Sequence, residues 1–182
     1  MARKSEKMSD NSFRFMNFTF KLVDFIYPHV KNRSKTFGIS KGMTVIDYGC
    51  GPGRYTTEFA KLVGENGQVY AVDIHELAIK EVKKKTGKLG LKNVEPILVE
   101  GYDCPLPDDT ADIIFALDMF FNIKEPTEFL GELNRLTKPE GILIIDEGHE
   151  KRSKTKNKIE KSGYWTIYDE TKDHMKYKPK KI

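Results

Sequence analysis

The sequence predicts a single α/β domain with a doubly wound sheet of seven strands, mostly parallel, with an antiparallel hairpin at one edge and helices on both faces. Three observations support this prediction. Short apolar runs alternate with amphipathic stretches from residue 43 onward, the connections between them are short, and two alternating runs close the chain. Regular alternation of strands and helices is typical of parallel sheets with right-handed crossovers.

Five short apolar runs have the composition of buried parallel strands. They are residues 43–49, 68–73, 94–100, 111–120 and 141–146. Amphipathic stretches predict helices between and after them, at residues 54–63, 76–90, 125–141 and 154–163. Two later runs alternate apolar and polar side chains across a short polar link, at residues 164–170 and 174–178. This alternation predicts the edge hairpin.

The N-terminal part of the chain differs from the rest. Residues 1–12 are polar and are expected to be disordered, so the domain is expected to span residues 13–182, with its α/β core at 43–180. Residues 13–36 begin with a helix that is apolar over much of its circumference. Its aromatic side chains are Phe13, Phe15, Phe18, Phe20 and Tyr27. Two interpretations stay open: this segment packs on the core, or it forms a helical lid over a ligand.

Composition limits the class of protein. The chain has 182 residues, enough for one domain with a sizeable core. No run reaches the roughly 18 apolar residues that cross a bilayer, and the first residues lack the apolar segment of a secretory signal. The two cysteines, Cys50 and Cys104, have neither metal-ligand spacing nor a disulfide framework. These features predict a soluble, cytoplasmic protein with reduced thiols.

Positive charge is concentrated at the C-terminal end. Residues 151–182 carry 11 Lys and Arg against 4 Asp and Glu, a net charge of +7 in a chain whose total is +4. The favoured interpretation is a solvated, lysine-rich helix and tail, because a nucleic-acid surface usually also carries interleaved aromatic side chains. Contact with an anion stays open.

The first predicted strand runs into a glycine-rich loop. Residues 45–53 read VIDYGCGPG, with glycine at three alternate positions. In an open α/β sheet this loop lies where ligands bind, beyond the C-terminal ends of the strands. Glycine permits positive φ and close approach of a ligand, and the next helix presents free N–H groups. Asp73, which ends the second strand, can accept hydrogen bonds from both hydroxyls of a ribose. A nucleotide-like ligand is therefore predicted.

The glycine spacing distinguishes between nucleotides. The dinucleotide pattern G-x-G-x-x-G would place its third glycine at position 54, but that residue is Arg54 and the glycine is Gly53. This spacing argues against a nicotinamide oxidoreductase, which stays as a minor alternative.

Several segments, taken in order, carry a family resemblance. VIDYGCGPGRYT, VYAVD, LPDDTADIIFALDMF and LTKPEGILII resemble the class I S-adenosylmethionine-dependent methyltransferases, over roughly residues 40–180. The chain is most similar to the small-molecule branch that includes the ubiquinone and menaquinone C-methyltransferases. The resemblance implies a Rossmann-like fold with an antiparallel edge strand, and S-adenosyl-L-methionine as the cofactor. It also implies methyl transfer to a small acceptor by in-line displacement, and the aromatic N-terminal segment makes a partly apolar acceptor the expectation.

The resemblance implies roles for residues of the first two strand ends. Gly49, Gly51 and Gly53, with the backbone around them, would contact the methionine part of the cofactor. Asp47 would brace this loop or reach the amino group through water, or it could simply cap the loop. Asp73 would hold the ribose.

Further cofactor contacts are implied along the chain. Ile74 would pack on the adenine, although it could be ordinary core. Glu100 and Gly101 would bond the adenine edge, but relatives usually carry Asp at the position of Glu100, which could instead be a solvated strand end. Leu117 and Asp118 would border the reacting centre.

Methyl transfer from a sulfonium requires little beyond alignment of the methyl group with its acceptor, because the methyl group is already activated. A general base is required only if the acceptor loses a proton. The candidate catalytic residues are Asp118 and His149, the latter in the DEGHE segment after the fifth strand. Asp118 could instead cap its loop, and His149 could be a surface histidine. No metal site is predicted, because the four histidines are dispersed.

The end of the fourth strand bears on the acceptor. It reads ALDMFFN rather than the N/D-P-P-aromatic loop of enzymes that methylate a flipped base. A small-molecule acceptor is therefore expected in place of nucleic acid, with the chain acting as a monomer or homodimer. The alternative function is a protein that binds the cofactor without transferring methyl, as a sensor or a partner subunit.

Overall fold

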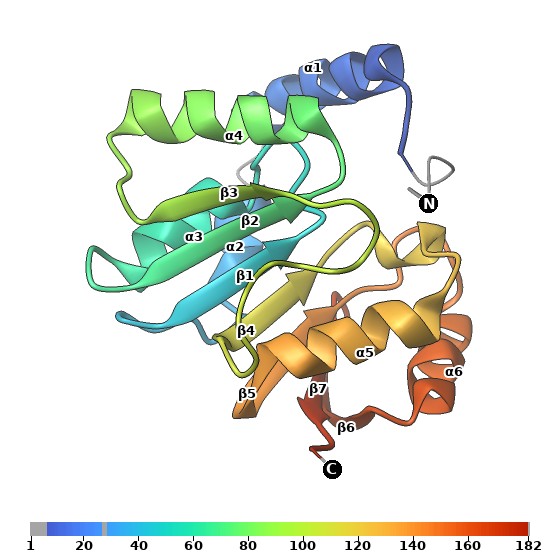
Figure 1. Cartoon of the computed structure of the whole chain (residues 1–182). Coiled ribbons are helices and arrows are strands. Elements are labelled where there is room, and N and C mark those ends of the chain that lie inside the picture. The colour runs from blue at the N-terminus through green and yellow to red at the C-terminus, as the bar shows by residue number, and fades with distance from the viewer. Residues whose placement is uncertain (1–6, 27–28, 182) are drawn as a thin grey trace.

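The computed structural model describes residues 7–26 and 29–181, and it shows one seven-stranded sheet with helices on both faces (Figure 1). The strands are β1 (Thr44–Tyr48), β2 (Gln68–Asp73), β3 (Val94–Leu98), β4 (Ala111–Ala116), β5 (Thr137–Ile145), β6 (Trp165–Glu170) and β7 (Met175–Pro179). Their order is β3-β2-β1-β4-β5-β7-β6, with β1 to β5 parallel and β7 antiparallel to its two neighbours. The predicted fold class and its edge hairpin are confirmed.

The strand order changes direction at β1, which lies between β2 and β4. The chain runs outward from β1 to β2 and β3, then returns to the other side of β1 as β4 and β5. The connections that leave β1 and β4 therefore diverge to opposite faces of the sheet and leave a crevice beyond the strand ends. The loop at residues 49–55 opens onto this crevice.

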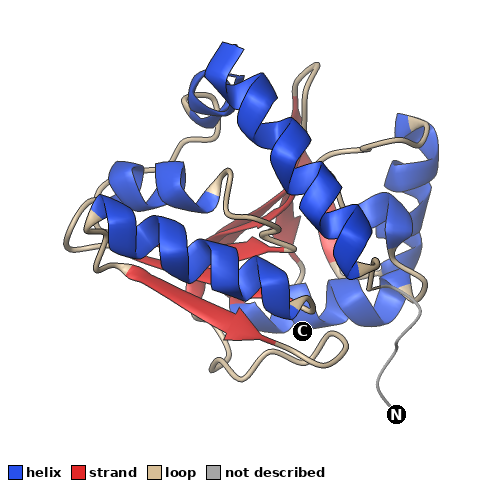
Figure 2. Ribbon diagram, turned by 90° about the horizontal axis from the view of Figure 1, so that it is seen from above, coloured by secondary structure: helices blue, strands red, loops and turns tan. Residues whose placement is uncertain are grey.

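The helices form the two outer layers. They are α1 (Asp10–Ile26), α2 (His29–Ser34), α3 (Thr56–Val63), α4 (Glu76–Leu89), α5 (Pro126–Leu136) and α6 (Arg152–Ser162), with a short 3₁₀ turn η1 (Phe120–Asn122). Val45 packs in the layer that contains α3, whereas Ile46 packs in the layer that contains α5 and α6. Successive side chains of a strand point to opposite faces, so one apolar run serves both layers. Figure 1 shows α4 above the sheet and α5 and α6 below it, and Figure 2 shows the helices around the strands from above.

Strand β5 begins earlier than the sequence predicts, at Thr137. Its pairing with β4 passes from Thr137 to Ile142 while β4 advances only from Ala111 to Ile113. The extra residues form an irregularity in the strand, in place of a turn before it. It lies at the N-terminal end of the strand, away from the crevice.

The N-terminal boundary also differs. Residues 10–12 were expected to be disordered, but they belong to α1, so that expectation is wrong for these three residues. Ser9 explains the early start, because its Oγ accepts a hydrogen bond from the N–H of Ser12 at 3.2 Å and caps the helix. Residues 1–6 lie outside the described part of the chain. No helix in that described part is long and apolar enough to cross a membrane.

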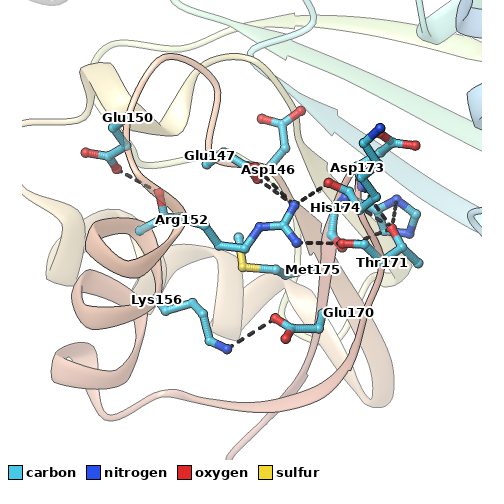
Figure 3. Close-up of polar contacts among 12 residues, drawn as sticks. Asp146, Glu147, Glu150, Arg152, Lys156, Glu170, Thr171, Asp173, His174 and Met175 are labelled. Carbon is cyan, nitrogen blue, oxygen red and sulfur yellow. Dashed lines mark hydrogen bonds and ion pairs between the residues drawn. The ribbon is translucent and has the colours of Figure 1, made fainter.

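Arg152, the first residue of α6, holds the edge hairpin in place (Figure 3). Its guanidinium donates hydrogen bonds to both carboxylate oxygens of Glu147, at 3.0 and 3.1 Å. It also donates to the carbonyl oxygens of Thr171 and Lys172, each at 2.6 Å. The β6–β7 turn is thereby fixed to the start of α6.

We expect Arg152→Met to lower the free energy of unfolding by about 1–3 kcal/mol, because the carbonyl groups of the turn lose their charged donor. Lys156→Met is the matched control. Lys156 pairs with Glu170 at 3.1 Å on the same hairpin, but both side chains are partly exposed, so a change within about 0.5 kcal/mol is expected. Urea denaturation measures both values. Equal losses in the two variants would contradict the anchoring role of Arg152.

Candidate functional site

A cavity lies at the C-terminal ends of β1, β2 and β4, where the strand order changes direction. Its floor consists of the glycine loop and the strand ends, which bring Asp47, Asp73 and Asp118 into its lining. Its roof is helix α1. The crevice predicted from the strand order is therefore a real hollow with acidic groups at its base.

Two glycines of the loop face this cavity, for different reasons. Gly49 has φ of 75°, and a Cβ there would lie 3.0 Å from Cγ of Met119, so the close approach is to another loop of the protein. Gly51 has φ of 51°, and a Cβ there would meet no atom within 4 Å. Because Gly51 lines the cavity, its missing side chain leaves bare backbone next to open space. This backbone can approach a ligand closely.

Gly53 does not line the cavity, so the structure does not support the cofactor contact expected of it. It is buried with φ of 74°, and a Cβ there would lie 2.9 Å from Cγ2 of Val82 in α4. Its physical role in the structure is close packing of the loop against α4.

The Asp73 carboxylate ties the glycine loop to the end of β2. Oδ2 accepts a hydrogen bond from the N–H of Gly51 at 2.8 Å, and Oδ1 accepts one from the N–H of His75 at 2.8 Å. Burial raises the pKa of Asp73, and these two hydrogen bonds oppose the shift. Each carboxylate oxygen can accept a further hydrogen bond from a ligand in the cavity.

The Asp47 carboxylate is buried beneath the loop and accepts a hydrogen bond from Oγ1 of Thr56 at 2.5 Å. Burial raises the pKa of Asp47 to about 7, the Thr56 hydrogen bond opposes this shift, and the charge of Asp73 adds to it. A cation in the cavity would stabilise the charged form of Asp47.

Asp118 follows β4 and has φ of 55°, in the left-handed region that non-glycine residues seldom adopt. Its N–H donates to Oδ1 of Asp146 at 2.8 Å, and Oδ2 of Asp146 accepts a hydrogen bond from Arg33 at 2.8 Å. The same guanidinium donates to the Tyr55 hydroxyl at 2.9 Å. These bonds fix the backbone of Asp118 and the hydroxyl of Tyr55, both of which line the cavity.

The pair of Arg33 and Asp146 was not found from the sequence. Both side chains are almost fully buried, with exposed fractions of 8% and 6%. Burial raises the pKa of Asp146, the charge of Asp118 adds to the shift, and Arg33 opposes it. Asp146 stands directly after β5, as Asp47 and Asp73 stand near the ends of their strands, and this pattern was the available signal.

Only some of the other predicted site residues line the cavity. Ile74, Gly101 and Leu117 line the cavity. Glu100 is exposed and outside the cavity lining, because the chain turns after β3 and presents Gly101 instead. His149 is likewise exposed and outside the lining, with its ring edge-on to Phe121 at 4.9 Å. The cofactor contact of Glu100 and the catalytic role of His149 therefore have no structural support.

His75 is a lining residue that the sequence did not reveal. Its Nδ1 accepts a hydrogen bond from the N–H of Leu77 at 3.2 Å, so it caps α4. Its ring lies 4.6 Å from that of Phe13, and its buried Nε2 has no hydrogen-bond partner among the described residues. The available signal was its position as the residue before the α4 helical pattern, next to Asp73 and Ile74.

The roof is made by one side of α1. Phe13, Met16 and Phe20 line the cavity, and the guanidinium of Arg54 lies 4.1 Å from the centre of the Phe20 ring. Phe15 and Phe18 were expected to contribute to this apolar pocket, but they point away from it, because 3.6 residues per turn put them on the opposite side of the helix. Tyr27 lies outside the described residues.

Among residues 7–26 and 29–181, no group of three or more His, Cys, Asp or Glu side chains is placed to hold a metal ion. The groups that converge at the cavity floor are instead suited to an organic cation. Asp47, Asp73 and Asp118 offer negative charge, and the Gly51 backbone offers close approach. S-adenosylmethionine carries a sulfonium and an ammonium group, so these residues fit it.

We expect Gly53→Ala to destabilise the fold by about 1–3 kcal/mol, since the new methyl group meets Val82 and the positive φ disfavours a side chain. Gly87→Ala in α4 is the matched control. A Cβ at Gly87 meets nothing within 4 Å, so this change should stabilise the helix by about 0.4–1 kcal/mol. Chemical denaturation measures both. A neutral Gly53→Ala would contradict the packing role.

Asp47→Asn should raise the free energy of unfolding at pH 8 by roughly 2–4 kcal/mol, with little effect near pH 4. The folded-state pKa of Asp47 is about 7 and the unfolded value is about 4, so the folded state binds the proton more tightly. Stability is therefore lost as the pH rises from about 4 to 7 in the parent chain, and the neutral Asn removes this loss.

Urea titrations of both proteins across this pH range provide the measurement. A difference that does not change with pH would show that Asp47 does not carry the titration.

Comparison with known proteins assigns this chain to a family. A family profile described as a methyltransferase domain matches residues 39–180. The chain is 34% identical over 111 residues to the ubiquinone/menaquinone biosynthesis C-methyltransferase UbiE of Escherichia fergusonii. That match covers 60% of this chain and 44% of the relative, so the chain spans less than half the length of the curated relatives it matches.

Solved structures of methyltransferases also resemble this chain. A SAM dependent methyltransferase from Aquifex aeolicus is 33% identical with a TM-score of 0.73, over 81% of this chain and 88% of that one. A protein from Methanococcus maripaludis, 19% identical, covers 100% of this chain and 98% of its own with a TM-score of 0.77, which shows the same fold. The family match extends over most of the chain and includes the glycine loop and the three carboxylates of the cavity. The chain belongs to the methyltransferase domain family, and this membership implies S-adenosyl-L-methionine as its cofactor.

Proposed function

We propose that this protein transfers a methyl group from S-adenosyl-L-methionine to a small, partly apolar acceptor. The observation that carries the proposal is the cavity itself. Three carboxylates and bare glycine backbone form its floor, and the apolar side chains of Phe13, Met16 and Phe20 form its roof. The floor suits a cationic nucleoside, and the roof suits an acceptor with apolar surface.

The cofactor would be held by residues of the floor. Asp73 would accept hydrogen bonds from the ribose hydroxyls, since its carboxylate faces the cavity and is already oriented by two N–H groups. The buried carboxylate of Asp47 would pair with the ammonium group, directly or through water. Gly51 would allow the chain to lie against the methionine part, and Ile74 would pack on the adenine.

The bound cofactor supplies a methyl group activated by its positively charged sulfur. The chain's own task is to align an acceptor with that group and exclude water, which α1 favours by covering the cavity. In the displacement, an electron pair of the acceptor would form the new bond to carbon while the carbon–sulfur electron pair stays on the leaving sulfur. Where the acceptor must lose a proton, we propose that Asp118 takes it, in the position set by Asp146 and Arg33.

The relative named for ubiquinone and menaquinone biosynthesis supports a small organic acceptor. We therefore propose carbon methylation of a ring compound as the first chemistry to examine, with no nucleic-acid partner. A cytoplasmic location and a monomer or homodimer belong to the same proposal. Both cysteines are buried free thiols, which suits a reducing compartment.

The direct test is mass spectrometry after incubation with methyl-deuterated S-adenosylmethionine and a small-molecule extract of the source cells. A new species that carries the intact labelled methyl group is expected, and it would identify the acceptor. Tight cofactor binding without any labelled product would favour the alternative, a sensor or partner subunit. Absence of cofactor binding would contradict the proposal.

Asp73→Asn tests the proposed cofactor site in a separate binding experiment. It should weaken cofactor binding about 10- to 100-fold, measured by calorimetry, because one charge-assisted bond to the ribose is lost. Asp169→Asn is the matched control, because Asp169 is exposed on β6 and lies outside the cavity lining. Equal affinity of Asp73→Asn and the parent chain would show that the ligand binds elsewhere.

A further inference from the structure

Helix α1 has a second apolar face that no part of the described chain covers. Phe15, Phe18 and Leu22 have exposed fractions of 71%, 66% and 54%. They lie three and four positions apart, on the side of the helix opposite to Phe13, Met16 and Phe20. This outer face of α1 therefore looks away from the cavity. Large aromatic side chains exposed together usually mark a contact surface.

Helix α4 carries a lysine face. Lys80, Lys83, Lys84 and Lys88 are exposed, whereas Ala78, Ile79 and Val82 on the other side of the helix are buried against the sheet. In all, α4 has five Lys against two Glu. Leu89, at its end, has an exposed fraction of 53%. The lysine face is thus a concentrated positive surface with an apolar residue at its end.

The two helices lie on one side of the molecule. The N-terminal end of α1 and the segment before it at Lys7 contact the start of α4, through the rings of Phe13 and His75, 4.6 Å apart, and through the ion pair of Lys7 with Glu76. Figure 1 shows both helices along the upper margin, and Figure 2 looks down on that side. A surface that approaches from this side meets α1 and α4 together.

We propose that the outer face of α1 and the lysine face of α4 together dock on an anionic lipid bilayer. Aromatic and leucine side chains enter the boundary between headgroups and acyl chains, while lysines are attracted to anionic headgroups. The positive charge of the lysine face favours an anionic bilayer over a second copy of this chain. A two-fold contact over this surface would bring two lysine faces toward each other, which is unfavourable.

The docking would also serve the cavity, a consequence that rests on the proposed function. Helix α1 would lie between the bilayer and the cavity, with one apolar face on each. An apolar acceptor dissolved in the lipid could then reach the cavity along α1 without crossing bulk water.

The test is co-sedimentation with phosphatidylcholine vesicles, prepared with and without phosphatidylglycerol. The parent chain should bind the anionic vesicles, and added salt should weaken this binding. Phe15→Ser/Phe18→Ser/Leu22→Ser and Lys80→Glu/Lys84→Glu/Lys88→Glu should each lower the partition coefficient about tenfold or more. The matched control is Ile167→Ser/Tyr168→Ser, which removes exposed apolar side chains from β6 and should leave binding unchanged. Circular dichroism and thermal unfolding show that each variant is folded.

Several results would overturn the proposal. They are equal binding to both vesicle types, no loss in either α1 or α4 variant, or an equal loss in the β6 control. A dimer in sedimentation that the α1 variant abolishes would assign the surface to a second copy instead. The vesicle assay contains neither cofactor nor acceptor, so its failure leaves the methyl-transfer proposal untouched, and failure of methyl transfer leaves the docking result untouched.

Discussion

The position of β1 between β2 and β4 is the constraint on which the site depends. It brings three strand ends together, and with them Asp47, Asp73 and Asp118. The connections diverge there, so the loop after β1 packs against α4 on one side and opens onto a cavity on the other. Helix α1, which precedes the sheet in the chain, covers that opening from outside. The apolar cores on the two faces hold these strand ends at fixed positions.

This arrangement carries an electrostatic cost. Burial raises the pKa of Asp47, Asp73 and Asp146, so each carboxylate is harder to ionise than it would be in water. The protein offsets part of the cost with fixed donors: Thr56, two backbone N–H groups and Arg33. A cationic ligand would offset more. A site that is less stable when empty than when filled binds such a ligand more tightly.

Helix α1 connects the site with the outer surface. It is apolar on two opposite sides, and only one of them is accounted for by the cavity. A helix that merely completed a core would bury both sides or carry polar residues on the outer one. The Arg54 guanidinium lies over the Phe20 ring and gives the inner side a specific polar neighbour, whereas Phe15, Phe18 and Leu22 on the outer side are exposed. The two sides thus have different chemical surroundings.

The sequence by itself determined the alternation of strands and helices, the glycine loop, the position of Asp73 at the end of a strand, and the edge hairpin. Periodicity, glycine placement and strand ends are local properties of a sequence. It could not determine which residues reach the cavity. Gly53 was grouped with Gly51, but packing of α4 decided its role, and the turn after β3 moved Glu100 outside. Arg33 and Asp146 are 113 positions apart, so only the tertiary structure could join them. Whether a side chain of α1 faces the cavity or the solvent depends on how α1 packs over the sheet, since apolar side chains on two opposite sides leave the rotation of the helix undetermined by sequence.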